Sequence, residues 1–464
     1  MPRKSPVSLD GLMALGSAKL AQLVLDQAET DAAFKRRVSA AVASTQGASA
    51  VAKLIDRRLA SLRRSRSWVD YEKERAFAAD LGATLDTIVK ELGPVSPFDA
   101  IDRLLAFIDT SANVFERIDD SNGRIQGVYW DAAEAVPGLA ERLPAEDRAL
   151  LPQRLQRHLL TGDHGLGISV ATAVVPLLSP EALIEWDKSL HAAETGQEFH
   201  GLRQAIADAR GDLQTYLALE KELPAFERKP LAAAERLLAA GRLDEALSWV
   251  RRPSKGGRVV DYWDGGEGVT GFHALERARL EARILEAMNK LPEAQSLRWK
   301  HFLTTLDAGL LREYIAKLGD FEEFDELDKA FAAATASKDI HGALEFFLAW
   351  PRRDLAAKLV LDQRKSWQGR NYEMLGPVAA ELEAEFPAAS TLLYRIMLDD
   401  ILDRARSPAY GAGARHFVKL SALAARADGG EGLESHAAYT ARLKQKHGKK
   451  ASFWDAAEDR KRAK

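Results

Sequence analysis

The residues best placed for binding chemistry lie on a basic helix face near the N-terminus. Apolar side chains recur at helical spacing between residues 51 and 66, which predicts a helix with one buried face. The opposite face carries Lys53, Arg57 and Arg64, and Trp68 follows the helix. Cations beside aromatic rings can bind phosphates and stack on bases, so this face is a candidate contact for an anion or a partner. The alternative is a solvated face that pairs with the protein's own acids, which is the more common use of a charge run.

One cation falls within the apolar face of this helix. Arg58 lies among the residues that share the buried stripe. A buried guanidinium requires a counter-charge or a path to solvent, so Arg58 should pair with an acid or extend to the surface. The stripe is formed by Val51, Leu54, Ile55, Leu59 and Leu62.

A second basic segment lies at the C-terminus, in residues 436–454. Its candidate anion or partner contacts are Lys444, Lys446, Lys449 and Lys450. Large apolar side chains are interleaved with them, namely Tyr439, Leu443, Phe453 and Trp454. A terminal repeat must cover the apolar edge of its neighbour, so we favour a docked cap over a nucleic-acid contact. The basic residues after Asp459 should be disordered.

Other patterns that suggest chemistry lack a required element. The G-x-G-x-x-G match at residues 266–271 has no buried strand of a parallel sheet before it. The turn at 119–123 would place Ile118 and Tyr129 at calcium-ligand positions, where carboxylates are needed. The group His158, Asp163 and His164 lacks a diagnostic metal spacing. We therefore expect no catalytic residue, no bound cofactor and no metal.

The segment 321–331 combines acids with apolar residues. Five acids lie between residues 322 and 328, and Phe321, Phe324, Leu327 and Phe331 recur at core spacing. This pattern predicts a helix with a solvated acidic face and these four side chains in the core, with a basic partner as the alternative.

Helix signals dominate the whole chain. Ala, Leu, Glu, Arg and Lys are abundant, and all favour helices. Helix starts are predicted at Ser96-Pro97, Ser179-Pro180 and Leu291-Pro292, because proline fits the first helical turn. Alternating strand patterns are nearly absent apart from residues 258–263. The fold class is therefore all-α.

The C-terminal half repeats one design, in which a helix, a short break and a second helix follow one another. It occurs at residues 237–250, 284–299, 346–361 and 382–398, with Ala246, Ala294, Ala356 and Ala389 at the predicted helix crossings. Small residues let two helices approach closely, as in tetratricopeptide-like repeats. Because the spacing varies, we predict an irregular α-solenoid of such hairpins. The expected domains are an N-terminal helical region, 1–160, and a helical-repeat region with the C-terminal cap, 161–464.

Composition excludes several classes of protein. The 464 residues include no cysteine, which excludes disulfide frameworks and thiolate chemistry. Residues 1–66 carry a net charge of +7 and residues 442–464 of +6, whereas the whole chain carries −3. The isoelectric point of about 6.4 is low for a dedicated nucleic-acid binder. The least polar stretch, 168–178, is too short to span a bilayer, so we expect a cytoplasmic protein with no membrane contact.

Several segments resemble one family. They include 114–120, 281–302, 343–351, 391–402, 409–417 and 436–454. The chain resembles a proteobacterial all-helical family catalogued as a domain of unknown function, over nearly its whole length. Its C-terminal pattern is also similar to the helical part of bacterial SWIM-type zinc-finger proteins, although the chain has no cysteine for that zinc finger. The resemblance implies a bacterial helical protein and assigns no site residue.

The sequence leaves three functional hypotheses. The first is a non-enzymatic helical-repeat scaffold or adaptor that binds another protein. The second is a nucleic-acid-associated protein that uses its basic N- and C-terminal segments. The third is an enzyme whose site has no recognisable motif.

Overall fold

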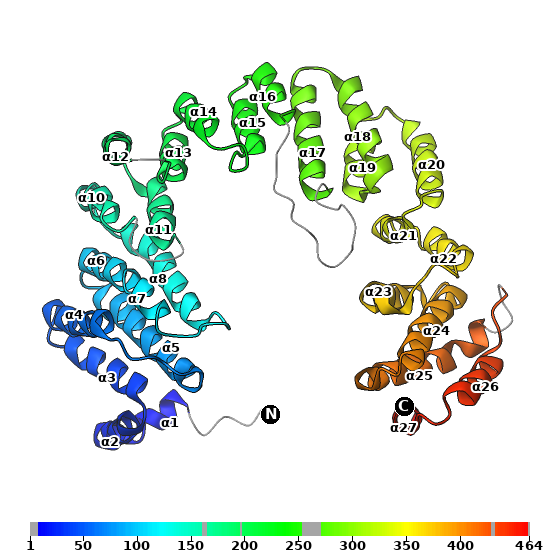
Figure 1. Ribbon diagram of the computed structural model, residues 1–464, viewed down its shortest axis with the longest axis horizontal. Coiled ribbons are helices and arrows are strands. Elements are labelled where there is room, and N and C mark those ends of the chain that lie inside the picture. Colours follow the sequence, from blue (N-terminus) through cyan, green and yellow to red (C-terminus); the bar gives the residue numbers. More distant parts are fainter. Residues whose placement is uncertain (1–7, 160–164, 195–196, 253–270, 428–431, 463–464) are drawn as a thin grey trace. The chain divides into compact units, whose positions relative to one another are not determined.

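Helices form nearly all of the regular structure. The computed structural model describes residues 8–159, 165–194, 197–252, 271–427 and 432–462 (Figure 1). Within these ranges the β-structure is one isolated bridge between Val69 and Ile118. The prediction of an all-α, solenoid-like fold is confirmed. The strand-like segment 258–263 and residues 266–270 of the glycine motif lie outside the described residues.

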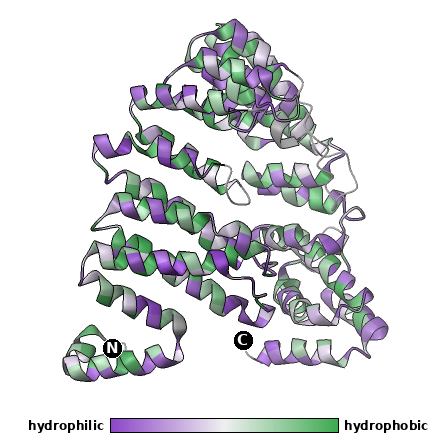
Figure 2. Cartoon of the chain, turned by 60° about the vertical axis from the view of Figure 1, so that its left-hand side comes forward, coloured by the Kyte–Doolittle hydropathy of each residue, from purple (hydrophilic) through white to green (hydrophobic). Residues whose placement is uncertain are grey.

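The chain divides into two compact units, residues 1–229 and 230–464. This division differs from the boundary expected at residue 160, because the core of the first unit continues past that point into later helices. Hydrophilic and hydrophobic residues mix along the helices of both units, as expected for helices with one buried and one exposed face (Figure 2).

The first unit contains short and long helices connected by short turns. In chain order they are α1 (Leu9–Met13), α2 (Gly16–Thr30), α3 (Ala32–Ser44), α4 (Ala48–Arg64), α5 (Tyr71–Asp86), the π-helical turn η1 (Thr87–Leu92), α6 (Pro97–Ile108), α7 (Ser111–Phe115), α8 (Arg124–Ala140), α9 (Ala145–Arg148), α10 (Leu151–Gln156), α11 (Leu166–Val174), η2 (Val175–Leu177), α12 (Pro180–Ala193), α13 (His200–Ala209) and α14 (Leu213–Glu222). The helix starts predicted at Pro97 and Pro180 are confirmed.

One hydrophobic cluster, from Val51 to Ile206, forms the core of the first unit. Helix α8 packs against α5, α6 and α11 at its centre. Tyr129 on α8 is fully buried, stacks on Phe107 with ring centroids 4.9 Å apart, and shares a 2.8 Å hydrogen bond with Thr110. The predicted apolar stripe of α4 faces this core, and the basic residues on its other face are thereby held at the surface.

The second unit continues the helical pattern. Its elements are α15 (Pro230–Ala239), α16 (Leu243–Val250), α17 (Gly271–Ala287), α18 (Leu291–Thr305), α19 (Ala308–Ile315), α20 (Glu322–Thr335), α21 (Ile340–Ala349), α22 (Arg353–Asp362), η3 (Gly369–Asn371), α23 (Tyr372–Leu382), α24 (Pro387–Asp403), η4 (Ser407–Ala409), α25 (Tyr410–Ala427), α26 (His436–His447) and α27 (Ala451–Arg462).

The predicted helical hairpins are present in the second unit. Helices α15 and α16, α17 and α18, α21 and α22, and α23 and α24 pack in pairs. The four alanines predicted at the crossings are all completely buried: Ala246, Ala294, Ala356 and Ala389. Gly241 and Asn289 turn the chain between paired helices with φ of 70° and 58°, a left-handed conformation that suits these two residue types. Gly211 makes the same turn between α13 and α14 in the first unit, with φ of 67°.

The C-terminal helices cover α25. Tyr439, Leu443 and Phe453 are fully buried, and Trp454 is partly buried with its ring centroid 5.6 Å from that of Phe417. The prediction that these side chains dock is confirmed. The prediction of disorder after Asp459 is wrong for residues 460–462, because α27 packs along α25 and continues to Arg462.

None of the described helices has the length and apolar character needed to cross a membrane.

Candidate functional site

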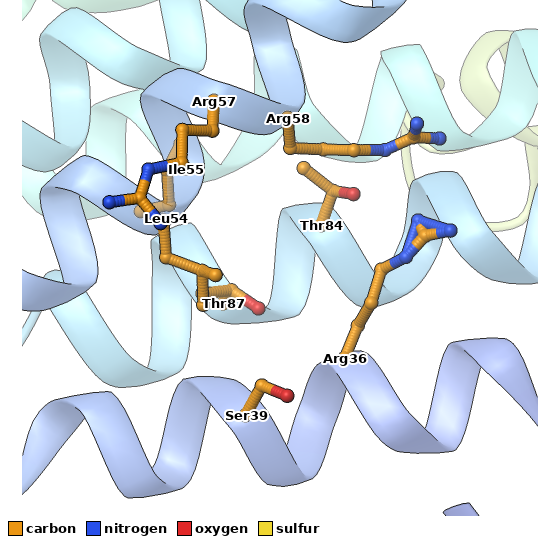
Figure 3. Close-up of a pocket in the computed structure, with 8 residues that line it drawn as sticks. All are labelled: Arg36, Ser39, Leu54, Ile55, Arg57, Arg58, Thr84 and Thr87. Carbon is orange, nitrogen blue, oxygen red and sulfur yellow. The ribbon is translucent and has the colours of Figure 1, made fainter. Parts of the chain in front are cut away.

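A cavity of about 350 Å³ opens where α3 packs against α4, α5 and η1 (Figure 3). Its walls come from several elements, and its lining residues run from Arg36 to Thr87. It is lined by Arg36, Ser39, Leu54, Ile55, Arg57, Arg58, Thr84 and Thr87.

Two of these arginines share one carboxylate. Arg36 from α3 and Arg58 from α4 both form ion pairs with Asp80 on α5. The Asp80 side chain is only 11% exposed, so the pairs are partly shielded from water. Burial lowers the pKa of the Arg58 guanidinium, because removal from water disfavours its charged form, and Asp80 offsets part of that effect. The prediction that Arg58 pairs with an acid is confirmed.

The sequence candidates Lys53 and Arg57 lie on the exposed face of α4, where Arg57 lines this cavity and Lys53 lies next to it. Within the described part of the chain, neither has an ion-pair or hydrogen-bond partner. Both line a second, adjoining cavity of about 480 Å³, which also has no acidic residue in its lining. We refer to the surface formed by Arg36, Lys53, Arg57 and Arg58 as the basic groove.

The other two candidates near α4 lie apart from the basic groove. Arg64 lies near the end of the helix, where its Nε donates to the carbonyl of Ala60 at 3.1 Å. Trp68 follows the helix and is 61% exposed. Neither residue lines either of the two cavities.

Three of the four C-terminal lysines contact their own chain. Lys446 Nζ lies 2.6 Å from Asp403, and Lys450 Nζ donates to the Tyr410 hydroxyl at 3.2 Å. Lys444 Nζ lies 5.8 Å from the ring centroid of Trp454, where a cation is attracted to the ring face. These contacts fasten the cap, and Lys449 is the one lysine of the four with no such contact among the described residues.

The start of α20 differs from the sequence prediction. Phe321 and Phe324 are 80% and 61% exposed, although their spacing predicts a core position. The reason is that α20 buries only its second half, through Ala330, Phe331 and Ala334. Phe321 also lies before the helix, at its N-cap, with φ of 72°. Exposed acids adjoin the two phenylalanines in the sequence, namely Glu322, Glu323 and Asp325.

The histidine and aspartate candidates for a metal have other roles. His158 Nδ1 lies 2.7 Å from Asp109, whereas Asp163 and His164 lie outside the described residues. Asp120 accepts hydrogen bonds from the backbone N–H groups of Ile125 and Gln126 and thus caps α8. The described residues hold no group of three or more His, Asp or Glu arranged to ligate a metal ion.

Comparison with known proteins gives one family and one similar structure. A family model described as "Family of unknown function (DUF6880)" matches residues 2–198 and 194–456. No curated protein matches the chain. A solved structure described as "Circular tandem repeat protein with novel repeat topology and enhanced subunit contact surfaces" is similar at 12% identity, with 97% of this chain and 91% of that chain covered and a TM-score of 0.17.

Proposed function

The chain belongs to the DUF6880 family, and we propose that it is a non-enzymatic helical-repeat scaffold that binds another protein. The contact surface we propose is the exposed aromatic start of α20, formed by Phe321 and Phe324. A scaffold of this kind needs apolar groups held in water until a partner covers them.

The observation that carries the proposal is the conformation of Phe321. A left-handed backbone costs a residue with a side chain about 1–2 kcal/mol, and glycine adopts it freely. Phe321 has this backbone with φ of 72°, and its ring is 80% exposed, so neither the turn nor the core benefits from the phenylalanine. Strained, exposed positions of this kind cluster at binding sites. An aromatic anchor for a partner accounts for both properties.

The surrounding charges indicate the chemistry of the partner. Glu323 and Asp325 flank Phe324 and form no ion pair within the described residues. Complementary charge favours a partner segment that carries Lys or Arg around one or two apolar side chains. Aromatic anchors in such interfaces contribute a large share of the binding free energy.

The test uses a substitution that should not harm folding. In Phe321→Gly the ring is removed and the left-handed turn is relieved, so the melting temperature should stay the same or rise. Combined with Phe324→Ala, it should abolish recovery of a specific cross-linked partner in affinity purification from the native host. Phe226→Ala is the matched control, because Phe226 is also an exposed phenylalanine, at 71%, in a different unit. Equal recovery by the wild type and the double variant contradicts the proposal.

The basic groove supports nucleic-acid association as the second candidate function. Lys53 and Arg57 are exposed and have no counter-charge within the described residues, whereas three of the C-terminal lysines bind their own chain. Nucleic-acid binding through phosphates weakens steeply as salt rises. A mobility-shift assay at two salt concentrations, with Lys53→Gln/Arg57→Gln as the variant, separates this candidate from the first.

A further inference from the structure

We propose that the cavity between α3, α4 and α5 binds a small organic anion, namely a carboxylate or phosphate group carried on an apolar body. The inference does not depend on the aromatic surface of α20, which lies in the other unit. It rests on the charge of the cavity, the placement of its arginines and the hydrogen bonds of its hydroxyl groups.

The cavity carries more positive than negative charge. Arg36 and Arg58 share the single carboxylate of Asp80, which balances only one of their two charges, and Arg57 has no counter-charge within the described residues. The three guanidinium groups and one carboxylate therefore leave an excess of two positive charges. An anion between them supplies a counter-charge where solvent screening is reduced.

The arginines lie on both sides of the space. Figure 3 shows Arg57 on one side of the cavity and Arg36 with Arg58 on the other. The planar guanidinium group binds carboxylate and phosphate oxygens through paired N–H donors, so groups on two sides can hold one anion. Burial lowers the pKa of Arg58, and the neighbouring positive charge of Arg36 lowers it further.

The hydroxyl groups of the cavity cannot serve as donors to the anion, because each already donates to a backbone carbonyl. Ser39 donates to Lys35 at 2.8 Å, Thr84 to Asp80 at 3.0 Å, and Thr87 to Ala83 at 2.8 Å. Recognition of the anion therefore depends on the arginines.

The remaining walls favour an organic ligand over a bare ion. Leu54 and Ile55 contribute apolar surface beside the arginines. The volume of about 350 Å³ falls within the range of roughly 300–1,000 Å³ that is usual for small-molecule sites. An anion with a short apolar chain can pair with the arginines and also contact the apolar side chains.

The experiment is isothermal titration calorimetry of the full chain with four probes. Hexanoate and hexyl phosphate carry the proposed chemistry and distinguish its carboxylate and phosphate forms. Hexanol lacks the charge, and inorganic phosphate lacks the apolar body. At least one of the first two should bind saturably with a Kd of about 1 mM or tighter, and both of the others at least tenfold more weakly. The proposal is overturned if hexanol or inorganic phosphate binds as tightly as the organic anions, or if neither organic anion saturates.

Three variants locate the binding. Arg57→Gln should weaken the affinity for the organic anion at least tenfold. Arg64→Gln removes the same charge from the same helix outside the cavity and should leave the affinity unchanged. Thr87→Val should also leave it unchanged, because the hydroxyl hydrogen is already committed. Arg57 is exposed, so a normal melting temperature should show that the variant is folded. Equal losses in Arg57→Gln and Arg64→Gln would mean that only the overall charge matters, and the site assignment would be wrong.

Discussion

The phenol of Tyr439 donates a 2.9 Å hydrogen bond to Asp399 Oδ1, which joins α26 to α24. Tyr439 is fully buried, and burial raises the pKa of both the phenol and the Asp399 carboxyl group. Arg442 extends from α26 to the second oxygen of Asp399 at 3.5 Å. The C-terminal cap is therefore held by a shielded polar contact as well as by apolar packing.

Removal of that hydroxyl should destabilise the protein. Tyr439→Phe keeps the ring but leaves a partly buried carboxylate without one donor, which should cost about 1–3 kcal/mol of the free energy of unfolding. Denaturant titration followed by circular dichroism measures the change. Tyr372→Phe is the control, because the Tyr372 side chain is 47% exposed, and this substitution should change stability by less than about 0.5 kcal/mol. Equal stability of Tyr439→Phe and the wild type would show that the hydrogen bond contributes nothing.

The two neighbouring aromatic residues of the cap should differ in how much they stabilise the folded protein. Phe453 is completely buried against Phe417 and Tyr410, whereas Trp454 is partly exposed. Phe453→Ala should therefore cost about 3–5 kcal/mol, and Trp454→Ala clearly less. The same denaturant titration ranks them. The reverse order would indicate that the Trp454 contacts, including its 3.1 Å hydrogen bond to the His447 carbonyl, dominate the cap.

The crossing alanines should not tolerate larger side chains. Ala246 on α16 is completely buried in a helical hairpin, so Ala246→Leu forces α15 and α16 apart and should cost about 1–3 kcal/mol. Ala239→Leu makes the same change at an exposed position of α15 and should be nearly neutral. Thermal unfolding of the two variants provides the measurement. A neutral Ala246→Leu would contradict the close approach of the two helices.

His416 should make the protein less stable in mild acid. Burial, and secondarily Arg415, lowers its pKa from 6.5 to about 4 in the folded state. The unfolded chain then binds more protons than the folded chain between these values. The contribution of neutral His416 to the free energy of unfolding is fully present above pH 6.5. It is lost as the pH falls towards 4, by about 2–3 kcal/mol after allowance for partial exposure.

The substitution His416→Gln isolates this contribution. Stability should be measured by denaturant titration at several pH values between 7 and 4, and the slope should be shallower in the variant. Carboxylate titrations are common to both proteins and cancel in the comparison. Identical slopes would show that His416 does not titrate differently in the folded state.

Local sequence patterns sufficed for the fold class and for much of the packing. The spacing of alanine and helix-breaking residues predicts the hairpins, because both features act within about thirty residues of chain. The start of α20 shows the limit of such patterns. Core spacing at Phe321 and Phe324 predicts burial only where a neighbouring helix covers that turn, and coverage is a tertiary property. The resemblance to SWIM-type proteins stays a prediction.

The sequence predicted only part of the basic groove, because the rest depends on how the helices pack together. Lys53 and Arg57 are one helical turn apart, so periodicity places them together. Arg36 lies on a different helix, and only the packing of α3 on α4 and α5 brings it to the same cavity. The position of Arg58 within an apolar stripe indicated an acidic partner, but the identity of that partner, Asp80, depends on the same packing.

Asp80 joins three helices, because it lies on α5 and binds one arginine each from α3 and α4. A ligand in the adjoining cavity binds only while α3 remains against the other two helices. By mass action, the free energy of ligand binding adds to the free energy that holds α3 against α4 and α5. Backbone amides of α3 should then exchange their hydrogens with solvent more slowly when the cavity is filled. The proposed ligand thus reduces how often α3 separates from α4 and α5, because Asp80 already links all three helices.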